Sequence, residues 1–432
     1  MEMSDQNNFT ITAILDYMLA FMLVLTNNSI YTIGYTILSD VRIQALIILI
    51  YLPIGYINLR NTKSTNYLKM FLIVSGALSL VLIFFGKTGD NSFMSKKIWI
   101  TFFIFLPTMF IYIYSRICTG TMTILLTRVI KLIAVIACFS IFCWTFFSLL
   151  HIVPGKTIYS TWSGANIKDY LGIYYETQQQ KIFGMIVPRN TGFFAEAPMY
   201  AYILATAFIT NIFILEKPLK KEAVLIGVTI LTTFSSTGVV AMVLGIMCVV
   251  IRWVIRRVSN KVVTAGGIGI VFLIVLFIIS HMLSAKTQSL SYILRQDDIR
   301  AGIAAWRKNP IFGNGYRNEF VITSQMATWR HVQSDVHLIG YSSGIFTILS
   351  DGGIFLLLFY VGPIIINLIM IVMYGLKRNF WLLLGLSIML FMLVFSVVPY
   401  TAFTIFTIEL YYLYGLERTH DLDMSNSNHI LE

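Results

Sequence analysis

The sequence predicts an all-α, polytopic membrane protein, on the basis of its composition and the lengths of its apolar runs. The chain has 432 residues, of which 57% are hydrophobic and only 12% are charged. Soluble domains carry about 25% charged residues, so this composition excludes a disordered chain, a coiled coil and almost every cytosolic enzyme. Several apolar runs reach the roughly 20 residues that a helix needs to cross a hydrocarbon core of about 30 Å.

The apolar runs predict about twelve membrane spans within one integral membrane domain, residues 1–432. The expected spans are 10–26, 43–59, 67–85, 98–114, 130–150, 193–214, 222–235, 238–255, 262–282, 345–373, 380–397 and 401–416. Four cysteines without a CxxC spacing indicate neither a disulfide framework nor a zinc site. No metal and no cofactor is expected.

The basic residues of the short loops predict the orientation. With the N-terminus inside, every inner short loop carries Lys or Arg, as the positive-inside rule requires. Both termini are then cytoplasmic, and the two long loops, 151–192 and 283–344, face outward. The second long loop is expected to contain short helices. Met1 to Asn8 is acidic and polar rather than basic, so no cleavable signal is expected and the first run stays in the protein.

The first long loop ends in a patterned segment, residues 188–198, that contains Arg189, Gly192, Glu196 and Pro198. Pro198 suits the first turn of a helix, and the free amides of a helix start favour a phosphate. An ionised Glu196 at the membrane boundary requires a partner, and Arg189 is the nearest candidate in sequence. The segment is either a phosphate site or a structural ion pair that locks the loop.

A second patterned segment, in the large outer loop, runs from Asp297 to Tyr316. Asp297 and Asp298 are read as acids at a helix start, and Asn309 and Pro310 end the helix. Arg300 and Arg307 share one helix face, and two guanidinium groups beside a turn with two glycines can hold a diphosphate. The residues assigned to substrate binding in and after this helix are Arg307, Gly313, Gly315, Tyr316 and Arg317. Taken alone, a Gly-Asn-Gly sequence is more often only a turn.

Two histidines precede the span at 345–373. His331 and His337 can each accept a proton near neutral pH or donate to a phosphate oxygen, although Asp335 and His337 also fit an ordinary polar rim. Within the spans, the remaining acids are Asp16, Asp351 and Glu409. A chain of such acids would indicate an ion-coupled transporter, but three scattered acids do not form one.

A small polar turn, residues 234–238, contains Ser235 and Ser236. We assign both serines to the substrate site, with close helix packing as the structural alternative.

In their order among the spans, these segments resemble the O-antigen ligase and Wzy-type polysaccharide polymerase superfamily. The resemblance covers roughly residues 185–360. It rests on Arg189, Gly192, Phe193, Glu196 and Pro198, on the turn at 235–238, on Arg300, Trp306, Pro310, Gly313 and Gly315, and on Asp351 with Gly353. The family usually carries a histidine where this chain has Ser342 or Ser343, and His337 stands several residues earlier.

The resemblance implies a metal-independent membrane glycosyltransferase of the GT-C type in the bacterial inner membrane. Its donor would be an oligosaccharide on undecaprenyl diphosphate, with Arg189, Arg300 and Arg307 stabilising the leaving diphosphate. Either His337 or Glu196 would act as the base.

We expect a polymerase of repeat units for O-antigen, capsule or exopolysaccharide. The alternatives are a glycan ligase and, from another class, a flippase for the same lipid-linked glycan. The implied partners are membrane lipid, a chain-length regulator and a flippase, but no nucleic acid.

Overall fold

The computed structural model describes residues 2–33, 39–60, 76, 99–160, 162–182, 184–257, 290–332, 340–375 and 377–428. Within these residues the chain is mainly helical, and five helices are long and apolar enough to cross a membrane. Those five are Asp40–Arg60, Trp99–Cys118, Met122–Leu149, Ser236–Ile255 and Gly344–Tyr374. This architecture is consistent with a polytopic, multi-pass membrane protein.

The helices of the bundle follow the predicted apolar runs. They are α1 (Glu2–Leu25), α3 (Asp40–Arg60), η2 with α6 (Trp99–Cys118), α7 with η3 (Met122–Leu149), α8 (Ala197–Phe213), α9 (Lys220–Thr232), α10 (Ser236–Arg257), α15 (Gly344–Tyr374), α16 (Lys377–Leu393) and α17 (Ala402–Asn428). The predicted spans near 67–85 and 262–282 lie outside the described residues. At 13 residues, α9 is about 20 Å long, shorter than a hydrocarbon core, so twelve full spans are not confirmed.

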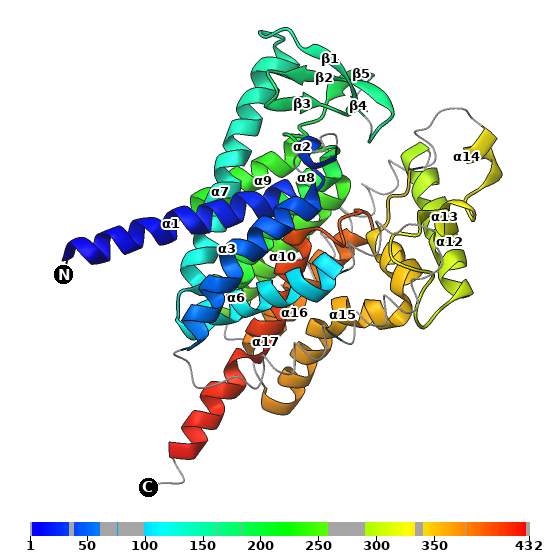
Figure 1. Cartoon of the computed structure of the whole chain (residues 1–432). Helices are drawn as coiled ribbons and strands as arrows, with labels where there is room; N and C mark the ends of the chain where they lie inside the picture. Colours follow the sequence, from blue (N-terminus) through cyan, green and yellow to red (C-terminus); the bar gives the residue numbers. More distant parts are fainter. Residues whose placement is uncertain are drawn as a thin grey trace.

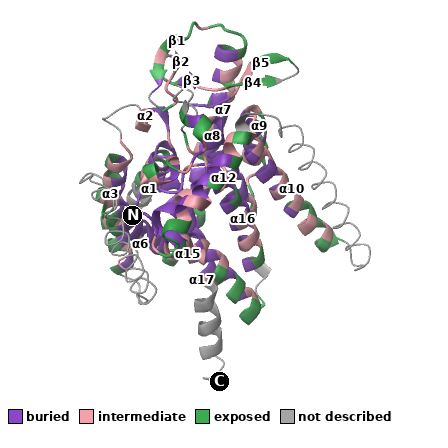
Figure 2. Ribbon diagram, turned by 90° about the vertical axis from the view of Figure 1, so that its right-hand side faces the viewer, coloured by how far each residue is buried: buried purple, intermediate pink, exposed green. Residues whose placement is uncertain are grey.

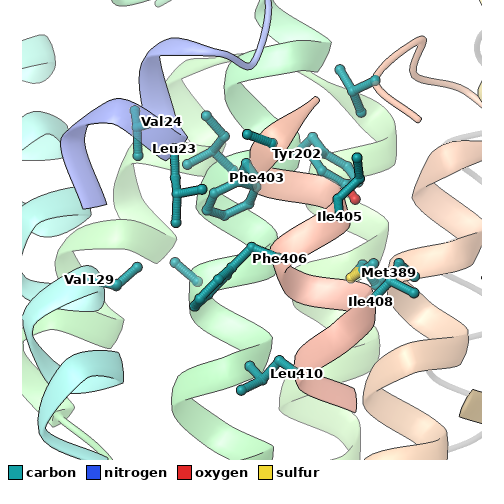
Figure 3. Packing of buried hydrophobic residues seen from close by; sticks show 14 of the residues in the cluster. Leu23, Val24, Val129, Tyr202, Met389, Phe403, Ile405, Phe406, Ile408 and Leu410 are labelled. Carbon is teal, nitrogen blue, oxygen red and sulfur yellow. The ribbon is translucent and has the colours of Figure 1, made fainter. Parts of the chain in front are cut away.

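The bundle has a buried interior and an apolar exterior. Figure 2 shows buried residues along the middle of the bundle and exposed residues at its periphery. Leu49, Val135 and Val372 are each more than 60% exposed, as lipid-facing side chains are in the absence of lipid. In Figure 3, Phe403 and Phe406 of α17 pack towards Leu23 and Val129, with Met389 beside the same helix. Residues 402–411 of α17 are all buried, so this part of the helix forms a central element of the bundle.

The first long loop corrects the all-α prediction, because it folds into two small sheets (Figure 1). One sheet contains β1 (Lys156–Ser160), β2 (Ala165–Tyr170) and β3 (Tyr174–Glu176), and the other pairs β4 (Gln179–Ile182) with β5 (Met185–Pro188); all neighbouring strands are antiparallel. Tyr170 and Tyr174 bury their rings against Phe147 of η3. This aromatic contact fixes the sheet on the end of the long α7–η3 helix.

The second long loop forms a helical lobe, as predicted. It contains α12 (Leu290–Lys308), α13 (Glu319–Thr323) and α14 (Thr328–Val332), which Figure 1 shows beside the end of α15. The helix α12 starts earlier than the sequence indicates, so Asp297 and Asp298 lie inside it rather than at its start. Its end at Lys308, just before Asn309 and Pro310, is as predicted.

Candidate functional site

Arg189 is held at the junction between β5 and α8 by two backbone carbonyls. Its amide donates to the carbonyl oxygen of Gln178 (3.0 Å), and its side-chain Nε donates to the carbonyl oxygen of Thr233 (2.9 Å). Among the described residues, neither terminal guanidinium nitrogen has a protein acceptor. Arg189 therefore has a fixed position and two open N–H-bearing nitrogens that can bind an anion.

Glu196 is the N-cap residue of α8, with an extended backbone and Pro198 in the first turn, as predicted. Its Oε1 accepts a hydrogen bond from the indole Nε1 of Trp162 (2.8 Å), whereas Oε2 has no donor among the described residues. The amide of Ala197 donates to the side chain of Gln178, and the amide of Met199 donates to Glu196 itself. Because Pro198 has no N–H, this helix start has no open first-turn amide for a phosphate.

Arg295, on α12, completes the site. Its guanidinium carbon lies 5.4 Å from the ring centroid of Phe395, in the connection between α16 and α17, a distance typical of a cation–π contact. Its charge interacts with those of both Glu196 and Arg189. We define Arg189, Glu196 and Arg295 as the Arg–Glu–Arg cluster, which joins residues from two distant parts of the chain.

The cluster is partly buried, and burial lowers the pKa of both arginines. Desolvation, with a contribution from the charge of Arg295, lowers the pKa of Arg189 to about 10, and Glu196 partly opposes this change. Desolvation also lowers the pKa of Arg295, while Glu196 and Asp298 favour its charged form. Arg189 remains protonated near neutral pH, and the cluster combines two guanidinium groups with one carboxyl group. Such a site attracts an anion with more than one negative charge.

The face of α12 that contains Arg295 packs on the bundle. Arg295 and Gly302 are seven residues apart and so share a face, and a Cβ on Gly302 would overlap Tyr341 and Phe346. Only glycine at this position lets α12 approach so closely. Arg295 is not among the residues predicted from the sequence. Its signal is the spacing of seven residues to Gly302, because a glycine on a helix face indicates close packing of that face.

Arg300 and Arg307 lie on another face of α12. At 3.6 residues per turn, Arg300 is rotated by about 140° from Arg295 around the helix axis. Its Nε and Nη2 donate to Oδ1 of Asp297 (3.0 and 2.6 Å), and its side chain is 59% exposed. Arg307 is exposed as well. The charge of Arg300 is thus paired within the lobe, and we replace Arg300 and Arg307 by Arg295 as the partner of Arg189.

Arg330 anchors the lobe and is fully buried. Its Nη1 donates to Asp297 (3.2 Å) and Asp298 (2.7 Å), and its Nη2 donates to the carbonyl oxygen of Gly340 (2.8 Å). Both amide and hydroxyl of Ser342 donate to Asp298. Asp297 and Asp298, which the sequence placed at a helix start, therefore connect α12 to α14 and to the segment before α15.

Of the two histidines, the structure describes His331, which contacts the lobe rather than the cluster. His331 is exposed, and its Nε2 lies 3.1 Å from the carbonyl oxygen of Thr323 in the lobe itself. His337 lies outside the described residues. The sequence left the base as either His337 or Glu196, and of these two the described cluster contains Glu196.

The Gly-Asn-Gly turn is a clamp on α15. The amides of Gly313, Asn314 and Gly315 donate to the carbonyl oxygens of Asn309, Ser350 and Asp351, respectively. These are the amides that a diphosphate would need, so this turn is not a phosphate cradle. The turn instead hydrogen-bonds to the backbone of α15 close to Gly353, whose φ of +63° interrupts the helix.

Tyr316 and Arg317 continue this clamp. The amide of Arg317 donates to Oδ2 of Asp351 (2.8 Å), which also accepts from Tyr400 Oη (2.9 Å). The Arg317 guanidinium lies over the rings of Tyr316 and Tyr400, at 5.6 and 5.9 Å. The predicted substrate ligands Tyr316 and Arg317 thus share a buried aromatic setting with Asp351, away from the face of Arg295.

The small polar turn, residues 234–238, follows directly after Thr233, whose carbonyl oxygen accepts the hydrogen bond from Arg189. Ser235 is buried and its hydroxyl pairs with that of Thr237 (3.0 Å). A Cβ on Gly238 would meet that of Ala201 at 2.8 Å, so the turn brings α10 close to α8. Ser235 therefore lies in a close helix contact near the site, which is the structural alternative considered for it, and Ser236 begins α10 in the same turn.

The acids in the spans do not form a path. Asp16 is paired with two arginines, Arg116 (2.9 Å) and Arg128 (2.6 Å), and Asp351 is bound within the clamp. Glu409 is buried, and among the described residues no group donates to its carboxylate. In that part of the chain, no three His, Cys, Asp or Glu side chains gather as metal ligands do.

One family comparison covers part of this site. Residues 223–361 match the family model described as O-antigen ligase. The matched region runs from α9 through the lobe into α15, so it includes Arg295 and the clamp, whereas Arg189 and Glu196 precede it in the sequence. The match confirms the predicted resemblance to the superfamily. None of the curated proteins matches the chain.

Proposed function

We propose, from the match of residues 223–361 to the O-antigen ligase family, that this protein is a glycosyltransferase of the bacterial inner membrane. It joins oligosaccharide repeat units that are linked to a polyprenyl diphosphate, and so makes a surface polysaccharide. The observation that supports this proposal most directly is the Arg–Glu–Arg cluster. Two guanidinium groups, one of them with open nitrogens among the described residues, suit a diphosphate, and a carboxylate whose charge interacts with both suits the activation of a hydroxyl.

The proposed reaction replaces a glycosyl–diphosphate bond by a glycosidic bond. A hydroxyl oxygen of the acceptor sugar attacks the anomeric carbon of the donor glycan, and the bond from this carbon to the diphosphate oxygen breaks. The electron pair leaves with the lipid diphosphate, and Oε2 of Glu196 accepts the proton of the hydroxyl. Arg189 and Arg295 stabilise the charge that develops on the leaving oxygen. Fixed charges of this kind act most strongly in a partly desolvated site.

A ligase is the second candidate, because the matched family is described by that activity. It would use the same donor and the same cluster, and transfer the finished glycan to a different acceptor. The two activities share every described residue of the site and differ only in the acceptor molecule.

An assay with two acceptors distinguishes the candidates. Purified protein receives lipid-linked repeat units extracted from the producing membranes, with or without a second acceptor such as lipid A core. A ladder of lengthened lipid-linked glycans identifies a polymerase, and transfer only to the second acceptor identifies a ligase. If the wild-type protein releases no polyprenyl diphosphate in either mixture, the glycosyltransferase proposal is contradicted, and lipid movement between leaflets is tested next.

A polymerase in this position needs partners. The lipid-linked repeat unit reaches an outward site only after a flippase has moved it across the membrane. A separate chain-length regulator would set the number of units that are joined. We include both proteins, together with membrane lipid, in the proposal.

A further inference from the structure

Trp162, in the first sheet, contacts Glu196 of the Arg–Glu–Arg cluster. Trp162 lies in the hairpin turn between β1 and β2, whose last pair is Ser160 with Ala165. The amide of Gly164 donates to the carbonyl oxygen of Ser160 (2.9 Å), which closes the turn. This sheet is anchored on η3 through Tyr170 and Tyr174. The hairpin and its anchoring on η3 therefore place Trp162 next to Glu196.

The indole of Trp162 is hydrogen-bonded through its N–H, and part of the residue is exposed. Its N–H donates to Oε1 of Glu196 (2.8 Å), while 38% of the residue is exposed. Because an indole N–H lies in the plane of the ring, the carboxylate lies at the N–H edge of the indole. A sugar packed against the exposed part of Trp162 would therefore lie next to Glu196, whose Oε2 has no donor among the described residues.

We propose that Trp162 is the platform for the acceptor sugar, an inference that rests on the proposed function. The apolar C–H face of a pyranose packs on the electron-rich face of the indole, and one hydroxyl then points at Glu196. The same side chain has a second role, because its N–H orients the carboxylate. Trp162 thus binds the acceptor through its ring face and positions the base through its ring nitrogen.

Two substitutions separate these roles. The probes are extracted lipid-linked repeat units as donor and, as acceptor, the repeat-unit oligosaccharide with a simple alkyl glycoside in place of the lipid. Trp162→Phe keeps an aromatic face and loses the N–H, so the acceptor KM stays near that of the wild type while kcat falls about threefold to tenfold, as for one lost hydrogen bond. Trp162→Ala loses both, so the acceptor KM also rises about tenfold.

The matched control is Trp329→Ala. Trp329 has almost the same exposure, 37%, but lies on α14 in the lobe; its loss should change neither constant. If Trp162→Ala is not recovered as folded protein, Trp162→Leu takes its place, with the same expected rise in the acceptor KM.

A wild-type acceptor KM in the Ala or Leu variant would overturn the platform. An acceptor KM in Trp162→Phe that rises as much as in Trp162→Ala would overturn it as well, since the ring face is retained. Absence of product from the wild-type protein is a different outcome, which contradicts the proposed function instead.

Discussion

Glu196 has one occupied and one open oxygen, and this asymmetry is what a base needs. Trp162 holds Oε1, so Oε2 faces the acceptor in the proposed reaction. A positioned general base contributes about 10²-fold to 10⁴-fold to a rate. Replacing Glu196 by Gln keeps the shape and the indole contact but removes the proton acceptor.

We therefore expect Glu196→Gln to lower kcat by at least about 10²-fold and to leave donor binding near that of the wild type. Product formation and binding of the lipid-linked donor are measured on the same purified protein. Glu319→Gln is the control, because Glu319 is an exposed acid on α13. Full activity of Glu196→Gln would assign the base elsewhere, with His337 as the next residue to test.

The sequence predicted two members of the cluster and missed the third for a physical reason. Arg189 and Glu196 are seven residues apart, so a local pattern could connect them. Arg295 comes about 100 residues later, and only the packing of Gly302 against Tyr341 and Phe346 turns its helix face towards them. Arg300 and Arg307 fit the same local pattern, but helix rotation puts them elsewhere. A pattern gives a helix face, whereas tertiary packing decides what that face meets.

The kink in α15 is the clearest element whose conformation demands glycine. Gly353 has φ +63°, and a Cβ there would overlap the backbone of Pro310 and Ile311. Gly375, at the end of the same helix, has φ +61°, but no atom would lie within 4 Å of its Cβ. Gly375, at φ +61° and ψ +26°, is in the left-handed helical region, where Ala costs about 1–2 kcal/mol. Gly353, at φ +63° and ψ −158°, is in a region that essentially only glycine adopts, so Ala strains the backbone more there and a steric clash is added.

We expect Gly353→Ala to lower the thermal unfolding temperature in detergent clearly more than Gly375→Ala does. The lobe is attached at this kink through the amides of Ile354 and Phe355, which donate to Pro310 and Ile311, so activity should fall as well. Equal unfolding temperatures of the two variants would show that the clamp does not depend on the conformation of Gly353.

A buried ion triad joins three other helices. Asp16 of α1 accepts hydrogen bonds from Arg116 of α6 and Arg128 of α7, and all three side chains are less than 10% exposed. Removal of one partner from a buried ion pair costs about 3–5 kcal/mol, because a desolvated charge is left behind. Asp16→Asn removes the carboxylate that both arginines bind.

Asp16→Asn should therefore reduce the amount of folded protein in the membrane and lower its unfolding temperature. Solubilised protein is compared by size-exclusion chromatography and thermal unfolding with Asp169→Asn, a change in the first sheet. Wild-type stability of Asp16→Asn would show that the arginines find other acceptors or water.

Element types followed the composition of the segments. Long apolar runs predicted the helices, because a membrane requires every backbone group to bond within its own helix. The strands of the first loop were missed, since β1 to β5 are three to six residues long. The first sheet is stabilised by the packing of Tyr170 and Tyr174 on Phe147. Such a tertiary contact is not indicated by short segments that lack a strong alternation of polar and apolar residues.

At the scale of the whole molecule, the proposed function requires the sheets and the cluster to lie on the outer side of the cytoplasmic membrane. The connection between α8 and α9 lies at the other end of α8 from Glu196 and contains the exposed Lys217. Leu171, in the turn between β2 and β3, is 72% exposed. These two positions report the two sides of the membrane.

A membrane-impermeant maleimide should label Leu171→Cys in cells with an intact cytoplasmic membrane, and should label Lys217→Cys only after the membrane is opened. Cys118 and Cys138, the exposed native cysteines, are first replaced by Ala. The reverse pattern would put the cluster on the cytoplasmic side and contradict the use of an exported donor.

The central claim is that Arg189 and Arg295, rather than Arg300, bind the diphosphate. It is tested most directly by titrating a short-chain polyprenyl diphosphate into purified wild-type, Arg189→Lys, Arg295→Lys and Arg300→Lys proteins. Lysine keeps the charge but loses the planar fork, so we predict at least about tenfold weaker binding for the first two variants, as for the loss of one charge-assisted hydrogen bond. Wild-type affinity is predicted for Arg300→Lys. Weakened binding by Arg300→Lys with wild-type affinity of Arg295→Lys would contradict the account.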